Sequence, residues 1–180
     1  VQHVSEQSHA MAGAVIAMSA AQAAALGQAC VEITIKLADS AEISHHDLST
    51  KVEQTKIALL QLCNEDAGAI AKFVALRESG SLLTGERLLC QIPFNTAQHA
   101  VEAALLLQSF RKSVNERVRD DLEMSICLLT GTAQAAVLLL DSNLRIWPEQ
   151  ALLSEFEPVL EALQEGINSL SPVTRIRERD

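Results

Sequence analysis

The sequence predicts an all-α fold, an up-and-down bundle of about five main helices in a single domain over residues 1–180. Hydrophobic residues make up 48% of the chain, yet only 3% of residues are aromatic and there is no tyrosine. A core built from Ala, Leu, Ile and Val favours closely packed helices over sheets rich in aromatic and β-branched residues. In addition, no segment alternates apolar and polar residues for long enough to predict a strand.

The clearest helix is the stretch Asp120–Leu144, which begins with two carboxylates, lacks proline and positive charge, and ends in Asp-Ser-Asn-Leu. Its apolar residues recur at three- and four-residue spacing, and further leucines fill much of the opposite side. A helix that is apolar nearly all round needs neighbours on every side. We therefore expect this helix at the centre of the bundle.

The first helix is rich in alanine and is expected at about Ser8–Lys36. Its segment Ala10–Val31 carries no charged residue and is long enough to cross a bilayer, but alanine, serine and glutamine make its transfer into lipid weak. No Lys or Arg occurs before the end of this helix, so a signal peptide is not predicted. Close packing is the better account, and we expect a homodimer that uses this helix near Ala14–Cys30 as its interface. Glu in place of Ala21 or Ala24 should then yield monomers or insoluble protein.

The other helices are bounded by caps, glycines and prolines. The second opens on a Thr-x-x-Glu capping box, a later one on an Asn-x-x-Gln cap, and the last on a proline, which suits the first turn of a helix. The predicted segments are a connection Ala38–Asp47 that contains His45 and His46, and helices at about Thr50–Glu78, Thr84–Cys90, Asn95–Ser113 and Pro148–Leu170.

Charge and cysteine usage exclude several classes of function. A net charge of −9 and a pI near 5.0 oppose binding to nucleic acid or to an anionic membrane, because phosphate groups bind clustered positive charge. The four cysteines form no CxxC pair and have no histidine at ligand spacing, so neither a metal site nor a disulfide framework is expected. We predict reduced, buried cysteines in a cytoplasmic protein.

Three segments in chain order resemble the cyclodeaminase/cyclohydrolase family. They read LCNEDAGAIAKF, IPFNTAQHAVEAALLL and NERVRDDLEMSICLLTGTAQAAVLLLDSNL, and they follow an alanine-rich first helix. The family comprises the helical domain of formiminotransferase-cyclodeaminase and stand-alone methenyltetrahydrofolate cyclohydrolases, and the resemblance covers roughly residues 10–146. It implies a homodimeric helical bundle that takes a tetrahydrofolate derivative as substrate and opens or closes a C–N bond at its one-carbon bridge.

The resemblance also implies a set of site residues. Asp66 and Asp121 match acidic elements of the family and are the catalytic candidates, because a carboxylate in a partly desolvated cleft can move protons between water and nitrogen. Asn143 could orient the pterin or the water through its amide. Gly13 lies at the position of a ligand-binding loop, and Arg87 is a candidate for the glutamate tail of the folate. We expect Asp66, Asp121 and Asn143 to line one cleft, shared between helices or between subunits.

Other roles for the same residues stay open. Asp121 could simply cap the central helix, Asn143 could end that helix in a left-handed turn, and Asp66 could be an exposed acid. The loop Met11–Ala14 has one glycine and no serine hydroxyl, and Leu139 replaces an asparagine of the family pattern. The alternative function is therefore a family member that has lost catalysis and acts as a dimeric binding or scaffold protein.

Overall fold

A computed structural model describes residues 11–38, 43–82 and 84–177 of the chain. Over these ranges the chain forms five α-helices, one short 3-10 turn and no strand. The elements are α2 (Ala12–Leu37), α3 (Ile43–Glu78), α4 (Glu86–Phe110), η1 (Glu116–Val118), α5 (Arg119–Ile146) and α6 (Gln150–Ser169). The predicted all-α class is confirmed.

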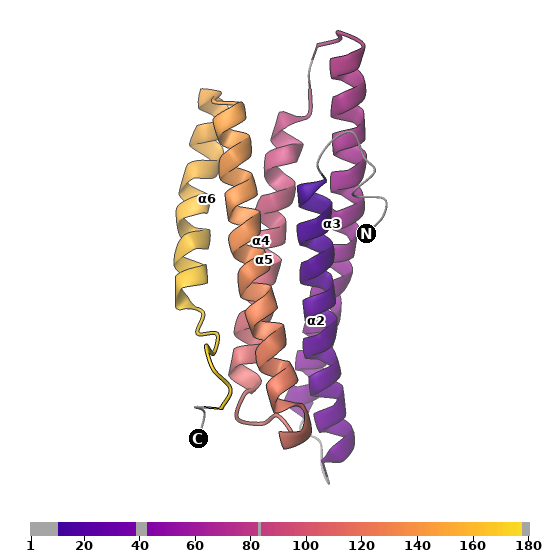
Figure 1. The fold of residues 1–180 in the computed structure, drawn as a ribbon, viewed down its shortest axis with the longest axis vertical. Helices are drawn as coiled ribbons and strands as arrows, with labels where there is room; N and C mark the ends of the chain where they lie inside the picture. Colours follow the sequence, from indigo (N-terminus) through magenta and orange to yellow (C-terminus); the bar gives the residue numbers. More distant parts are fainter. Residues whose placement is uncertain (1–10, 39–42, 83, 178–180) are drawn as a thin grey trace.

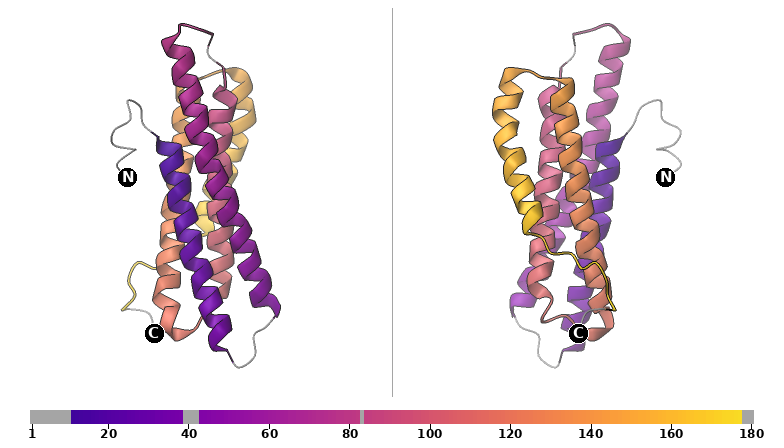
Figure 2. Two further views of the ribbon diagram at one scale, coloured as in Figure 1. Left: turned by 90° about the vertical axis from the view of Figure 1, so that its right-hand side faces the viewer. Right: turned by 60° about the vertical axis from the view of Figure 1, so that its left-hand side comes forward.

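The helices form an elongated up-and-down bundle (Figure 1). Four of them make a ring in which α2 contacts α3, α3 contacts α4, α4 contacts α5, and α5 contacts α2. Helix α6 lies outside this ring against α4 and α5. Figure 2 shows α2 and α3 side by side on the face away from α6. The largest cluster of buried apolar residues includes residues from all five helices.

Helix α2 packs closely because most of its buried residues are alanine or glycine. A Cβ atom added to Gly27 would lie 2.3 Å from Leu107 Cδ1 and 2.7 Å from Ser125 Oγ. The hydroxyl of Ser125 in turn donates to the carbonyl oxygen of Ala23 at 2.7 Å. Small residues on α2 therefore let α4 and α5 approach its backbone, as the composition predicts.

Helix α5 contacts α2, α4 and α6, but one of its faces has no neighbour. Along that face Met124, Leu128 and Leu138 are exposed. The expectation that this helix is buried on every side is therefore wrong for one face. By length and composition, α2 and residues 116–146 could each span a membrane, and half of each apolar window is buried inside the bundle. Core helices of soluble proteins meet the same criteria.

Helix α3 begins earlier than predicted, at Ile43. His45 and His46 therefore lie in its first turns, and the ring of His45 meets that of Phe110 edge-on with 5.1 Å between ring centroids. Thr50 lies inside the helix, where its hydroxyl donates to the carbonyl oxygen of His46 rather than capping a new helix. Packing against α4 extends the helix through a stretch that reads as a loop in the sequence.

Helix α4 is continuous where the sequence predicts a short piece and then a second helix. Pro93 lies inside it, and the side chain of Asn95 accepts a hydrogen bond from Gln91 instead of capping a helix start. At the last helix, Pro148 precedes the N-cap residue Glu149 instead of occupying the first turn. The four cysteines are free; Cys127 is exposed, contrary to the prediction that all four are buried.

Candidate functional site

Asp66 is a buried carboxylate that caps helix α2 from the neighbouring helix α3. Its side chain is 3% exposed, and its Oδ2 accepts a hydrogen bond of 2.8 Å from the backbone N–H of Ala14. Ala14 is the third residue of α2, and the N-cap residue Met11 makes no side-chain cap. Asp66 thus supplies from a distance the acceptor that an N-cap side chain would normally provide. The reading of Asp66 as an exposed acid is wrong.

Gly13 lies directly against this carboxylate. A Cβ atom at position 13 would be 2.1 Å from Oδ1 and 2.4 Å from Cγ of Asp66. Real Cβ atoms do not come so close to other heavy atoms, so a side chain here would displace the carboxylate. The structure therefore brings together two of the predicted site residues, Gly13 and Asp66, and gives the glycine a steric reason. Ligand binding by Gly13 stays a prediction.

The surroundings of Asp66 change its protonation. Burial raises the pKa of Asp66, and the hydrogen bond from the Ala14 N–H partly opposes that rise. The pKa of the nearby Cys63 thiol is also raised, first by burial and then by the charge of Asp66. A carboxyl group with a raised pKa can hold and release a proton closer to neutral pH, which is the property expected of a general acid or base.

Asn143 is bound to the backbone of α4. Its Nδ2 donates to the carbonyl oxygen of Leu89 at 2.7 Å. Leu89 lies four residues before Pro93, which lacks an N–H, so this carbonyl has lost its helical donor. The side chain of Asn143 replaces that donor and allows α4 to continue through the proline. In the described residues only glycines have a positive φ, so the reading of Asn143 as a left-handed helix end is wrong.

Asp121 lies toward the opposite end of the bundle from Asp66. It is exposed in the first turn of α5. Burial, followed by the charge of Asp121, raises the pKa of Cys30 to about 11, which places Asp121 near that thiol. Cys30 lies sixteen residues after Ala14 on α2, a rise of about 24 Å along the helix. Within one chain, Asp121 therefore does not share a cleft with Asp66. A cleft that the two residues share between subunits stays a prediction.

The separation of the two acids follows from helix direction. Helices α2 and α5 are antiparallel, and the bond from Ser125 to Ala23 fixes their register. Residues before Ser125 on α5 must then lie beside residues after Ala23 on α2, toward the end of α2 away from Asp66. Asp121 does not cap α5 either, because the N-cap position is Val118 and no side chain bonds there. The carboxylate of Asp121 does lie in the first turn, where the helix dipole favours a negative charge.

Arg87 forms an ion pair that ties α4 to α6. Its Nε lies 3.0 Å from Oε2 of Glu155, and its Nη2 makes a second short contact with Oε1 of the same side chain. The charge of the guanidinium is therefore already matched by a carboxylate in this chain. Binding of a folate glutamate tail by Arg87 stays a prediction and would require competition with Glu155.

Sequence reasoning did not identify a second buried carboxylate, Glu123. Its side chain is 1% exposed, and the guanidinium of Arg111 binds both of its oxygens, at 3.0 and 2.9 Å. Arg111 also donates to the carbonyl oxygen of Ser171 at 2.7 Å, which fastens the segment after α6 to the bundle. The only feature of the sequence that could have indicated this pair is a glutamate at an apolar position of the central helix, near a basic residue.

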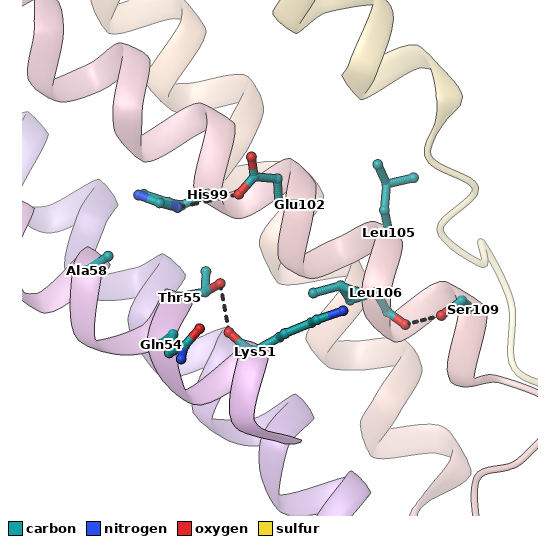
Figure 3. Close-up of a pocket in the computed structure, with 9 residues that line it drawn as sticks. All are labelled: Lys51, Gln54, Thr55, Ala58, His99, Glu102, Leu105, Leu106 and Ser109. Atoms are coloured by element: carbon teal, nitrogen blue, oxygen red, sulfur yellow. Dashed lines mark hydrogen bonds and ion pairs between the residues drawn. The ribbon is translucent and has the colours of Figure 1, made fainter. Parts of the chain in front are cut away.

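The described cavities lie along α3 or where it meets α4, not at the predicted site residues. The largest is a groove of about 750 Å³ between the two helices (Figure 3). None of the four described cavities is lined by Asp66, Asp121 or Asn143. Among residues 11–38, 43–82 and 84–177, no group of three or more His, Cys, Asp or Glu side chains could hold a metal ion.

The sequence model of a family described as formiminotransferase-cyclodeaminase matches residues 1–162. No curated protein matches the chain. The matched region contains all five predicted site residues and extends into α6.

Proposed function

Because the chain belongs to the formiminotransferase-cyclodeaminase family, we propose that it is a folate-dependent enzyme that opens or closes a carbon–nitrogen bond at the one-carbon bridge of a tetrahydrofolate. The reaction would be that of a methenyltetrahydrofolate cyclohydrolase or a formiminotetrahydrofolate cyclodeaminase. The folate is the substrate, no metal is required, and the protein acts in the cytoplasm.

One observation about this chain supports the proposal beyond family membership. Asp66 is buried, its pKa is raised, and a backbone N–H of α2 fixes its orientation. In our proposal Asp66 transfers the proton between water and the folate nitrogen. Asn143 retains its side-chain oxygen for positioning the substrate or the water, since the bond to Leu89 uses its amide nitrogen.

The proposed active form is a homodimer, and the outward face of α2 and α5 is its interface. Neither helix has a charged residue between positions 12 and 31 or between 124 and 140. Val15 and Met18 of α2 and Leu128 and Leu138 of α5 are exposed on this face. Exposed apolar surface of this kind marks association sites.

Dimerisation would also bring the two separated acids, Asp66 and Asp121, close together. A twofold axis perpendicular to the bundle makes the same patch face itself on both chains. Such an axis sets the Asp121 end of one chain beside the Asp66 end of the other. The two catalytic candidates would then meet across the interface, which a single chain does not allow.

Enzyme activity is tested with purified protein and 5,10-methenyltetrahydrofolate, with hydrolysis followed by absorbance. Asp66→Asn should reduce the rate on the order of a hundredfold, because the amide keeps the hydrogen-bond acceptor but cannot transfer a proton. Glu65→Gln is the matched control, since Glu65 is the adjacent acid and is exposed. Equal rates for wild type and Asp66→Asn would reject the role of Asp66.

The interface is tested by analytical ultracentrifugation. Ala21 and Ala24 are 2% and 0% exposed within their own chain, so the expectation that they lie at a subunit interface is wrong. Leu128→Glu places a charge on the proposed interface and should yield monomers. Ile57→Glu, at an exposed position of α3 outside this face, should leave the dimer intact. A monomeric wild type at micromolar concentration would reject the homodimer.

A second candidate function is a dimeric scaffold that has lost catalysis. It is favoured by the bonds of the predicted site residues within the fold: Asp66 binds Ala14, Asn143 binds Leu89 and Arg87 binds Glu155. Calorimetry with a reduced folate separates the two candidates. A dimer that neither binds the folate nor hydrolyses the methenyl substrate would be assigned to the scaffold function.

A further inference from the structure

The groove between α3 and α4 has the composition of a ligand site. Its volume is about 750 Å³, within the range of small-molecule pockets, which are mainly apolar with a few placed polar groups. Ala58 of α3 and Leu105 and Leu106 of α4 supply apolar surface. A second cavity of about 360 Å³ continues the groove and shares Lys51, Leu106 and Ser109 with it.

Lys51 gives the groove a positive charge. Its side chain reaches from α3 towards Leu106 on α4 (Figure 3). In the described part of the chain no carboxylate forms an ion pair with Lys51, although Asp47 lies one turn before it. The ammonium group is therefore available to an incoming anion.

The carboxylate that borders the groove already has partners. Oε1 of Glu102 accepts a hydrogen bond of 3.1 Å from Gln98, and Oε2 lies 3.6 Å from Nδ1 of His99. In Figure 3 its side chain points away from Lys51. The acidic Asp47 lines only the smaller cavity. In the larger cavity, Lys51 can therefore bind an anion away from the charge of Asp47, next to apolar surface that can hold the rest of the ligand.

From this arrangement we propose that the α3–α4 groove binds an amphipathic carboxylate. The apolar body of the ligand lies on Ala58, Leu105 and Leu106, and its carboxylate pairs with Lys51. This binding site is separate from Asp66 and goes beyond the proposed one-carbon chemistry. Neither depends on the other.

A small molecule fits this groove better than a helix from a protein partner. A helix with its side chains is about 10 Å across and needs a continuous trough. The Lys51 side chain crosses between α3 and α4 where the two cavities meet. A helix lying along the groove would therefore have to displace this side chain, whereas a small molecule can bind beside it.

The charge requirement is tested by calorimetry with octanoate and with 1-octanol, its neutral counterpart of the same length. Octanoate should bind up to about fivefold more tightly than octanol, because an ion pair with an exposed lysine contributes at most about 1 kcal/mol. Lys51→Met should remove that preference and leave octanol binding unchanged. Lys36→Met, at an exposed lysine outside the groove, should retain the preference.

The apolar requirement is tested by filling the groove. Ala58→Phe should weaken octanoate and octanol equally, whereas Ala71→Phe, at an exposed alanine of the same helix that lines no described cavity, should weaken neither. Equal binding of acid and alcohol to wild type, or an acid preference that survives Lys51→Met, would overturn the proposal. Unchanged binding to Ala58→Phe would overturn it as well.

The source of the carboxylate is distinguished by competition. If p-aminobenzoylglutamate displaces octanoate, the groove also accepts aromatic acids; if it does not, the groove is selective for aliphatic acids. Hydrolysis of methenyltetrahydrofolate is measured on the same Lys51→Met sample. Loss of the octanoate preference with normal hydrolysis confirms the groove without bearing on Asp66, so the two proposals fail separately.

Discussion

Asp66 and Glu123 are both buried carboxylates, but they lie near opposite ends of the bundle and have different partners. Asp66 faces a neutral backbone N–H and a glycine, and burial raises its pKa. Glu123 faces the guanidinium of Arg111, which binds both of its oxygens. The guanidinium compensates the burial of Glu123 with an opposite charge and two hydrogen bonds, whereas a single backbone donor offsets only part of the cost of burying Asp66.

This difference in partners indicates a structural role for Glu123 and a chemical role for Asp66. The pair of Glu123 and Arg111 joins α5 to α4 and to the segment after α6, so its role is to stabilise the fold. Asp66 also holds two helices together, but among residues 11–38, 43–82 and 84–177 it forms no ion pair. Because burial raises the pKa of Asp66, this carboxylate is suited to gain and lose a proton. The following changes test this comparison, from the largest expected effect to the smallest.

The largest effect is expected at Arg111. Arg111→Met removes the two donors that bind Glu123, and breaking a buried ion pair from one side costs about 3 kcal/mol or more. Urea unfolding monitored by circular dichroism would measure the change. Arg119→Met is the control, because Arg119 is exposed and its nearest acid, Glu116, is 3.9 Å away. A loss at Arg111 no greater than at Arg119 would remove the contrast with Asp66.

Gly13→Ala comes next. The added methyl group must displace the Asp66 carboxylate from the Ala14 N–H, and overpacking of this kind costs about 2 kcal/mol. Gly68→Ala in α3 is the matched control, since a Cβ atom there would have no neighbour within 4 Å. The control should be neutral or more stable, by up to about 1 kcal/mol, because alanine favours helix over glycine. Equal stability of the two variants would contradict the close contact.

Asn143→Ala should cost about 1.5 kcal/mol, because the Leu89 carbonyl loses the side-chain donor that replaces the missing N–H of Pro93. The explanation through Pro93 is tested by a double-mutant cycle. In a Pro93→Ala background the restored N–H at position 93 can donate to Leu89, so the loss of Asn143 should cost clearly less. Additive effects would show that Asn143 does not compensate for the proline.

Asp66→Asn should have the smallest effect on stability, within about 1 kcal/mol, because the amide oxygen can still accept from Ala14. Its signature is the dependence on pH. Since burial raises the pKa of Asp66, folding favours the protonated form. That stabilisation is complete below the ordinary aspartate pKa and is lost as pH rises through the raised pKa.

The variant should therefore gain stability relative to wild type as the pH rises from acid toward neutral. Unfolding of both proteins by urea at a series of pH values would measure this difference. Parallel pH profiles would mean that Asp66 titrates normally, and would remove the main support for proton transfer at this position.

The sequence by itself determined the all-α class and the types of residue that form the core. A low aromatic content, three- and four-residue spacing and an alanine-rich first helix predict closely packed helices, and the structure contains them. The family resemblance depends on residue order, and the match over residues 1–162 confirms it. These properties are local or linear, so they can be read along the chain.

Helix boundaries were decided by packing between helices. Residues 43–49 look like a loop because they are polar, but contact between His45 and Phe110 holds them in α3. Asn95 looks like a helix start, but Pro93 and Asn95 both lie inside α4, where Asn143 of α5 provides the donor that the proline lacks. Local propensity is a weak preference that tertiary contacts can override.

Only the tertiary structure decided which candidate residues meet. Gly13 and Asp66 are joined because α3 passes the start of α2. Asp121 is separated from them because α2 and α5 run antiparallel in the register set by Ser125. The sequence supplies the chemical groups, but the distances between them depend on helix direction and register, which arise from contacts between residues far apart in the chain.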